Sequence, residues 1–372
     1  MNDTSSLGVA VIGLGRFGRK RLASIASDAH ARLRMVADSV PEVAERTGAE
    51  LGCEHTRNWQ DTLACSDVDI VVVSTSTRFL PEIARAALEN GKHVLCEKPF
   101  GRSSHEVLPA VEAAERNHLC LKVGYNHRYH PALEKAHQLF VCGTIGKAHF
   151  IRCVYGHGGR SGYDQEWRAQ GEYSGGGQLL DQGVHALDLF RWFAGEFCTV
   201  KACTRTSFWP IAPLEDNVFA LLESSAGCLA SLHASWTNWK NTFAFEVFGE
   251  KGYLKVCGLG GPYGTERLCW GRLRVLGVTP EEEHFDFPES DPSLDREWLD
   301  FGTCVREGRT PQSDGRDAWQ TLRVAEAIYA ASTAPGTQIP SMQMEETSGT
   351  FQRRTPTVLV PAGCTAEREN LR

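Results

Sequence analysis

Short apolar runs alternate with longer segments of helical periodicity along the first third of the chain. This alternation is typical of a parallel sheet covered by helices. The apolar runs predict strands at residues 8–13, 33–38, 70–74, 93–96 and 119–124. Helices are predicted between them, because apolar residues recur three and four positions apart at residues 20–26, 83–89 and 107–116.

The pattern changes after Pro131, where a helix rich in Ala and Leu is predicted over residues 132–141. Long alternating runs follow, which are typical of strands with one buried face. They predict a mostly antiparallel sheet from residues 148–155, 199–206, 218–223, 227–237, 242–248 and 253–256. A last helix is predicted over residues 317–331.

These elements predict an α/β protein in which two sheets follow one another. We expect a Rossmann-type parallel sheet domain over residues 1–124, and an α+β domain with a mostly antiparallel open sheet over residues 125–334. The helix at 317–331 is expected to pack back on the first domain. Residues 335–372 are rich in Pro, Thr, Gly and Ser, and we expect a peripheral tail there.

Composition narrows the class of protein. Of the 372 residues 42% are hydrophobic and 23% are charged, which is typical of a globular protein. A net charge of −7 argues against a nucleic-acid-binding surface. The thirteen cysteines are scattered without metal-ligand spacing, so we expect reduced, mostly buried thiols and no metal site. No run is long enough to span a membrane and the N-terminus is not a basic signal, so a cytoplasmic protein is expected.

A glycine motif follows the first predicted strand directly. Gly13, Gly15 and Gly18 form G-x-G-x-x-G before a helical pattern, the context in which this motif binds the pyrophosphate of a dinucleotide. Asp38 ends the second predicted strand 20 residues after Gly18, where a carboxylate accepts hydrogen bonds from the adenosine ribose. The same carboxylate would repel a 2′-phosphate, so NAD is favoured. Because Arg16 or Arg19 could reach such a phosphate, NADP stays open as an alternative.

Glu97-Lys98-Pro99 lies at the carboxyl end of the fourth predicted strand of the first sheet, where open parallel sheets bind their ligands. A lysine there can meet a substrate hydroxyl. The alternative is a surface lysine in a turn.

A second candidate for the chemistry is the segment Gly175-Gly176-Gly177 with Asp181 and His185 after it. In a helix these last two side chains share a face one turn apart. Histidine can accept the proton of an alcohol near neutral pH, and a carboxylate nearby can orient its ring or bind the substrate. The alternative is an ordinary polar helix face, which Asp188 and Arg191 would continue.

Together these motifs resemble the glucose-fructose oxidoreductase and inositol dehydrogenase family, called Gfo/Idh/MocA, from about residue 8 to residue 331. Gly124–Pro131 resembles the family's domain junction, and Trp167-Arg168 resembles a pair often found before the triple glycine. Arg21 departs from the pattern, because many members have a histidine there.

The resemblance implies an NAD(P)-dependent oxidoreductase acting on a CH–OH group, with the nicotinamide between Lys98 and the Asp181/His185 helix, and a homodimer or homotetramer. The implied catalytic residues are Lys98, Asp181 and His185. The expected cofactor site comprises Gly13, Gly15, Arg16, Phe17, Gly18, Asp38, Ser74, Thr75, Glu97 and Lys98. The expected substrate site comprises Asn126, Arg128, Arg160, Tyr163, Trp167, Arg168 and Asp181. We expect His185 to be the base, with a pH limb near 6 to 7; Lys98 is the alternative base.

The substrate is predicted from the segment before the triple glycine. Arg160 and Arg168 suit a diphosphate, and Trp236 and Trp239 suit a sugar or base unless they are sheet core or oligomer interface. The pattern resembles the branch near UDP-N-acetylglucosamine 3-dehydrogenase, which forms a 3-keto sugar nucleotide used for surface polysaccharide or lipid A precursors. The alternatives are a dehydrogenase of a free sugar or cyclitol such as myo-inositol, and a non-catalytic cofactor- or sugar-binding regulator.

Overall fold

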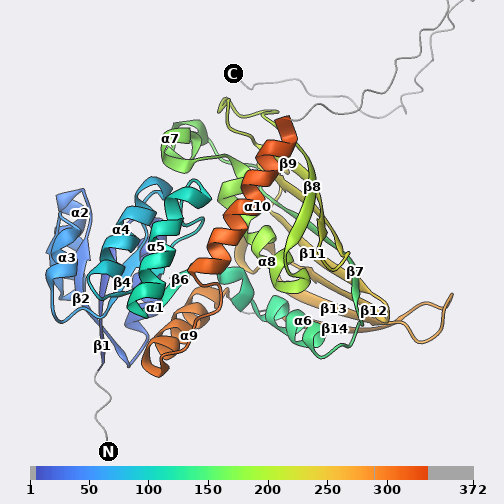
Figure 1. Cartoon of the computed structure of the whole chain (residues 1–372), viewed down its shortest axis with the longest axis horizontal. Coiled ribbons are helices and arrows are strands. Elements are labelled where there is room, and N and C mark those ends of the chain that lie inside the picture. The colour runs from blue at the N-terminus through green and yellow to red at the C-terminus, as the bar shows by residue number, and fades with distance from the viewer. Residues whose placement is uncertain (1–5, 289, 334–372) are drawn as a thin grey trace, which may run out of the picture. The chain divides into compact units, whose positions relative to one another are not determined.

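The computed structural model describes residues 6–288 and 290–333, and its first sheet has six parallel strands (Figure 1). The sheet order is β3-β2-β1-β4-β5-β6, the order of a Rossmann fold. Its strands are β1 (Leu7–Ile12), β2 (Ala31–Ala37), β3 (Glu54–Thr56), β4 (Ile70–Val73), β5 (His93–Cys96) and β6 (Leu121–Val123). The predicted fold class is confirmed here; β3 is an addition to the five predicted strands.

Helices cover both faces of this sheet. The helices from the first third of the chain are α1 (Arg16–Ala26), α2 (Pro41–Leu51), α3 (Gln60–Ala64), α4 (Leu80–Glu89) and α5 (Ser104–Asn117). One face packs against α4 and α5. The other packs against α1 and against α9 (Ser293–Glu307), whose Trp298 and Phe301 are buried beside Leu22 and Ile25. A helix from near the end of the described chain thus completes the core of the first sheet.

The second sheet has eight strands in the order β14-β13-β12-β11-β7-β10-β9-β8. Only β7 and β10 pair in parallel; the other neighbours are antiparallel, as predicted. The strands are β7 (Ala148–Gly156), β8 (Phe197–Arg205), β9 (Asn217–Ser224), β10 (Leu229–Ser235), β11 (Thr242–Gly249), β12 (Gly252–Cys257), β13 (Glu266–Arg272) and β14 (Glu281–Phe287). The last two were not predicted.

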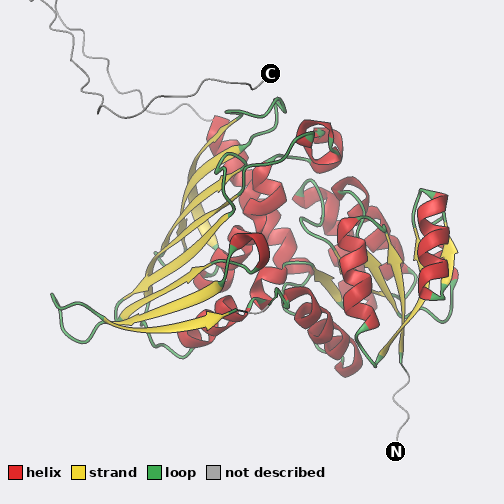
Figure 2. Ribbon diagram, turned by 180° about the vertical axis from the view of Figure 1, so that it is seen from behind, coloured by secondary structure: helices red, strands yellow, loops and turns green. Residues whose placement is uncertain are grey.

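Helices cover one face of the second sheet only (Figure 2). They are α6 (Pro131–Val141), α8 (Val184–Ala194) and α10 (Gly315–Thr333). The outward face exposes Phe219, Leu221 and Leu229, each more than half accessible. α10 also packs against α5 of the first sheet, and the described chain to residue 333 is one compact unit.

Two expectations are not tested by this architecture. The division at residue 124 remains a prediction, and the expected tail at 335–372 lies outside the described residues. Among the helices that are described, none combines the length and the apolar character needed to cross a bilayer.

Candidate active site

The turn between β1 and α1 is shaped by its glycines. Gly13 has a φ of +89°, and a Cβ there would lie 2.7 Å from the carbonyl oxygen of Ser74. A Cβ at Gly18 would lie 1.9 Å from the Gly13 oxygen, so only glycine lets α1 pack this closely. Nothing lies within 4 Å of the Cβ position of Gly15, which faces a cavity of about 540 Å³. The turn therefore has room for a phosphate at the N-terminus of α1.

Asp38 follows β2 at one end of this cavity. Its Oδ2 accepts a hydrogen bond from the Leu14 amide at 2.8 Å and its Oδ1 from the Val40 amide at 3.0 Å. Each oxygen keeps a second lone pair, so the carboxylate can still accept ribose hydroxyls. This geometry fits the adenosine end of NAD.

The cavity joins the first sheet to the segment before α8. The predicted cofactor-site residues that line it are Gly13, Gly15, Arg16, Phe17, Asp38, Ser74, Thr75, Glu97 and Lys98. Trp167, Arg168 and Asp181 line it from the other side. Gly18 lies behind the turn, where it allows the close packing of α1.

Lys98 and Asp181 meet in the wall of the cavity. The Lys98 side chain donates to the Asp181 carbonyl, and its Nζ lies 3.4 Å from the Asp181 Oδ1. Arg168 Nε lies 3.5 Å from the same oxygen, and the Tyr163 hydroxyl donates to Oδ2 at 3.5 Å. Burial favours a raised pKa for Asp181, but Lys98 and Arg168 hold that pKa below its usual value. Asp181 is therefore an ionised carboxylate at neutral pH.

Of the two roles predicted for Asp181, the described contacts favour binding of the substrate over orientation of His185. Asp181 lies in a π-helical turn, η5 (Leu179–Gly183), that precedes α8. Such turns are frequent at functional sites. The carboxylate faces Lys98, Arg168 and Tyr163, and none of the hydrogen bonds of the described chain joins it to His185.

His185 lies in α8 with a relative exposure of 4%. Its Nδ1 is buried and has no hydrogen-bond partner among the described residues. Burial lowers the pKa of His185 well below its usual value, and the positive charges of His127, Lys98 and His130 lower it further. A neutral imidazole therefore persists well below pH 6.5, and the pH limb that we expected near 6 to 7 moves to lower pH.

Arg128 and Asn126 do not line the cavity. Arg128 is buried and makes two hydrogen bonds to Asp188, at 2.8 and 2.6 Å, and an ion pair with Asp317 at 3.1 Å. Asn126 donates to the Ser293 hydroxyl at 2.7 Å. These contacts tie the segment after β6 to α8, α10 and α9. The structure therefore does not bring these two predicted substrate residues to the cavity lining.

Arg160 is also engaged elsewhere. Its guanidinium binds both carboxylate oxygens of Glu166, at 2.7 and 2.6 Å, on the protein surface. Tyr163 is buried beneath it with only its hydroxyl directed to Asp181. Trp236 packs edge-on against Tyr163 and is fully buried, which favours its sheet-core interpretation.

Arg21 occupies a buried ion-pair cluster next to the Glu97-Lys98-Pro99 segment. Its guanidinium lies 2.7 Å from Glu97 and 2.7 Å from Glu297 of α9. The residue that departs from the family pattern thus links α1 and α9 to the residue that precedes Lys98.

Several cavity residues were not predicted. They include Arg57, Trp59, Thr77, Phe79, Glu82, Ser174 and Leu180. Arg57 and Trp59 follow β3, which has only three residues and gives no periodicity to detect. Arg57 is the cavity arginine nearest in sequence to Asp38, and its charge suits a 2′-phosphate.

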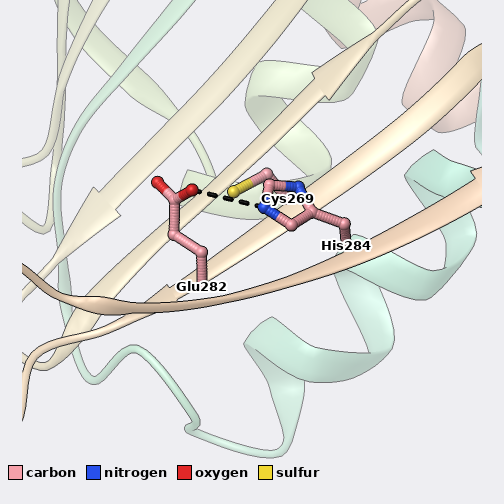
Figure 3. Close-up of side chains that lie close together, drawn as sticks. All are labelled: Cys269, Glu282 and His284. Atoms are coloured by element: carbon pink, nitrogen blue, oxygen red, sulfur yellow. Dashed lines mark ion pairs between the residues drawn. The ribbon is translucent and has the colours of Figure 1, made fainter.

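One group of side chains in the described chain has the spacing of metal ligands (Figure 3). Cys269 of β13 lies opposite His284 of β14, and Glu282 completes the group on the outward face of the second sheet. It offers three ligand atoms, where a structural zinc site has four. It lies outside the cavity, and we assign no metal to it.

The fold and the cavity define a nicotinamide-dependent oxidoreductase. A sequence profile described as "Oxidoreductase family, NAD-binding Rossmann fold" matches residues 7–125, and one described as "GFO/IDH/MocA C-terminal domain" matches residues 133–255. Together they cover more than half of the chain. The chain belongs to the Gfo/Idh/MocA oxidoreductase family, whose cofactor is NAD(P).

Relatives of known activity include sugar dehydrogenases. The levoglucosan dehydrogenase of Pseudarthrobacter phenanthrenivorans is 27% identical over 341 residues, covering 80% of this chain and 87% of the relative. The dTDP-3,4-didehydro-2,6-dideoxy-alpha-D-glucose 3-reductase of Saccharopolyspora spinosa is 29% identical over 250 residues, 67% of this chain and 74% of the relative. A crystal structure of levoglucosan dehydrogenase with NADH has the same fold, with a TM-score of 0.79, 23% identity, and coverage of 88% and 97%.

Proposed function

We propose that this protein oxidises a secondary alcohol of a free sugar or polyol with NAD. The observation that carries the proposal is the cavity itself, with the glycine turn and Asp38 at one end and the Lys98–Asp181 pair in its wall. When bound, NAD accepts the hydride from the alcohol carbon. The residues of this chain would hold the alcohol and take its proton.

His185 is the base in this proposal. Oxidation of an alcohol releases one proton to the protein. A neutral imidazole is already in the form that accepts a proton. Lys98 would stabilise the developing alkoxide and Asp181 would hold a hydroxyl and Lys98. In the alternative scheme Lys98 takes the proton and His185 only positions the sugar.

A free sugar is favoured over a sugar nucleotide because the arginines are already paired. Arg160 is bound to Glu166, and Arg168 lies 3.5 Å from Asp181. A diphosphate would have to displace these carboxylates. The levoglucosan dehydrogenase relative acts on a free sugar by its name.

A sugar nucleotide remains the second candidate, with UDP-N-acetylglucosamine oxidised to its 3-keto form as the specific reaction. Arg168 lines the cavity, and the relative from Saccharopolyspora spinosa is named for a dTDP-sugar. A spectrophotometric screen of NAD reduction with free sugars, inositols and UDP-sugars tests both. Turnover of UDP-sugars alone would refute the free-sugar proposal.

Arg160→Ala is expected to leave KM for the substrate within about twofold of the parent. The reason is that an exposed ion pair contributes about 0 to 1 kcal/mol and this one does not face the cavity. Steady-state kinetics with the best substrate measures it, and Arg85→Ala, which breaks the exposed pair with Glu89, is the matched control. A rise in KM of tenfold or more would instead support a diphosphate contact.

Asp38→Ser is expected to weaken NADH more than NADPH. The change removes ribose hydrogen bonds to a charged acceptor, worth about 1.5 to 3 kcal/mol each, so Kd for NADH should rise by roughly tenfold or more. NADPH should lose little, because the repelling carboxylate is gone. Fluorescence titration of the two cofactors measures both constants, and an unchanged preference would contradict the assignment of Asp38.

Association into a homodimer or homotetramer is also proposed. The exposed apolar side chains Phe219, Leu221 and Leu229 on the outward sheet face support it. Light scattering after gel filtration gives the mass directly.

A further inference from the structure

The imidazole of His127 stacks on the ring of His185. His127 belongs to the short helix η2 (Asn126–Tyr129), which follows β6, and it is 4% exposed. The two ring centroids are 3.9 Å apart and the ring planes differ by 21°, so the rings are stacked. His127 is not among the residues predicted for the site.

The orientation of His185 needs an explanation, because a catalytic histidine is usually fixed by a hydrogen bond from one ring nitrogen to a carboxylate or carbonyl. Here the Nδ1 atom is buried without a partner among the described residues. Asp181, one turn before His185, faces Lys98 instead, and Asp188, three residues after it, is bound to Arg128. Packing must therefore hold the ring.

Aromatic rings surround His185 on other sides, but only one is stacked. Tyr125 approaches edge-on with a centroid distance of 5.8 Å, and Tyr155 of β7 does so at 6.4 Å. Neither covers the face of the imidazole. His127 is therefore the contact that fixes the plane of the ring.

We propose that His127 is a positioning residue for the reaction and holds the plane of the His185 ring by stacking on it. This inference rests on the proposed function of His185 as the base. To hold the His185 ring in this way, the side chain at position 127 needs only to be flat.

The imidazole at position 127 has a further consequence for charge. The groups that face the pair are Lys98, from the end of β5, and His130, from the end of η2; both are positive when protonated. After burial, His127 is the strongest influence that lowers the pKa of His185, whereas burial, His130 and Lys98 lower the pKa of His127. Because the rings are stacked, a proton on either imidazole opposes protonation of the other.

The test compares His127→Ala with His127→Phe at pH 8. Loss of stacking in the Ala variant should lower kcat by roughly 10- to 100-fold, as a misplaced catalytic group does. The Phe variant keeps a flat ring and should recover kcat to within about fivefold, because a single buried ring is replaced by one of similar size. NADH binding by fluorescence confirms that each variant is folded. Parent-like kcat in the Ala variant, or equal losses in both, would overturn the proposal.

The pH profile of kcat/KM provides a readout that a purely structural role would not change. In His127→Phe the acid limb should move to higher pH, because Phe cannot bind a proton and so no longer opposes protonation of the stacked His185. His137→Phe is the matched control: His137 is also a stacked imidazole, half-buried, but it lies on Trp192 and has its pKa lowered to about 4 by burial. An acid limb at the parent position in His127→Phe would contradict the charge effect.

Carbon-13 histidine NMR separates this inference from the proposed function, because it needs no turnover. The ring protons of His185 should show an upfield ring-current shift that is kept in His127→Phe and lost in His127→Ala. Absence of the ring-current shift would overturn the inference even if the enzyme is active.

Discussion

His185→Ala is expected to lower kcat by roughly 10²- to 10⁴-fold, the usual loss when a general base is removed. Kd for NADH should stay unchanged, because His185 lies in α8 outside the residues that line the cavity. Stopped-flow measurement of NAD reduction, with fluorescence titration of NADH, gives both quantities.

The pH dependence shows which residue is the base. A base must be unprotonated, so kcat/KM falls as the pH drops through the pKa of His185, which burial places well below 6.5. The parent should show this acid limb and His185→Ala should lack it. If the limb persists in His185→Ala and disappears in Lys98→Met, the roles of His185 and Lys98 must be exchanged.

Arg128→Met is expected to lower the free energy of unfolding by about 3 to 5 kcal/mol, because it leaves a buried charge without its partner. Asp188 is fully buried, and burial raises its pKa against the opposing influence of Arg128. The pair joins the segment after β6 to α8, the helix that carries His185, so a loss of activity should accompany the loss of stability. Urea unfolding followed by circular dichroism measures it.

Two further variants make the Arg128 result specific. Adding Asp188→Asn to Arg128→Met should recover much of the loss, because the second change removes the unpaired charge. Arg85→Ala breaks the exposed pair with Glu89 and should cost less than about 1 kcal/mol. A small effect of Arg128→Met alone would show that water or a rearrangement of neighbouring side chains stabilises the Asp188 carboxylate in place of Arg128.

The sequence predicted those elements whose apolar pattern is strong. The buried runs of β1, β4 and β5 are continuous, and the strands from β7 to β12 alternate clearly. β14 was missed because it reads Glu-Glu-Glu-His-Phe-Asp-Phe, with charged side chains along its exposed face. α9 does contain Trp298, Phe301 and Val305 at helical spacing, so a signal for it was present and was not used.

Residues of the site were predictable where the backbone alone sets their place. The glycine turn, Asp38 and Lys98 lie at strand ends, and all reach the cavity. The arginines were not predictable, because an arginine looks the same in sequence whether it faces a ligand or a carboxylate. Arg128 pairs with Asp188, which is 60 residues away in sequence, and Arg160 pairs with Glu166.

The position of α9 bears on how this protein is made. The core of the first sheet contains Trp298 and Phe301 beside Leu22 and Ile25, about 270 residues apart along the chain. At a synthesis rate of about 5 to 20 residues per second, the ribosome adds those aromatic residues many seconds after β1 and α1 have emerged. Until α9 has been synthesised, one apolar face of the first sheet stays exposed to solvent. We expect chaperones to bind mainly to this face during translation.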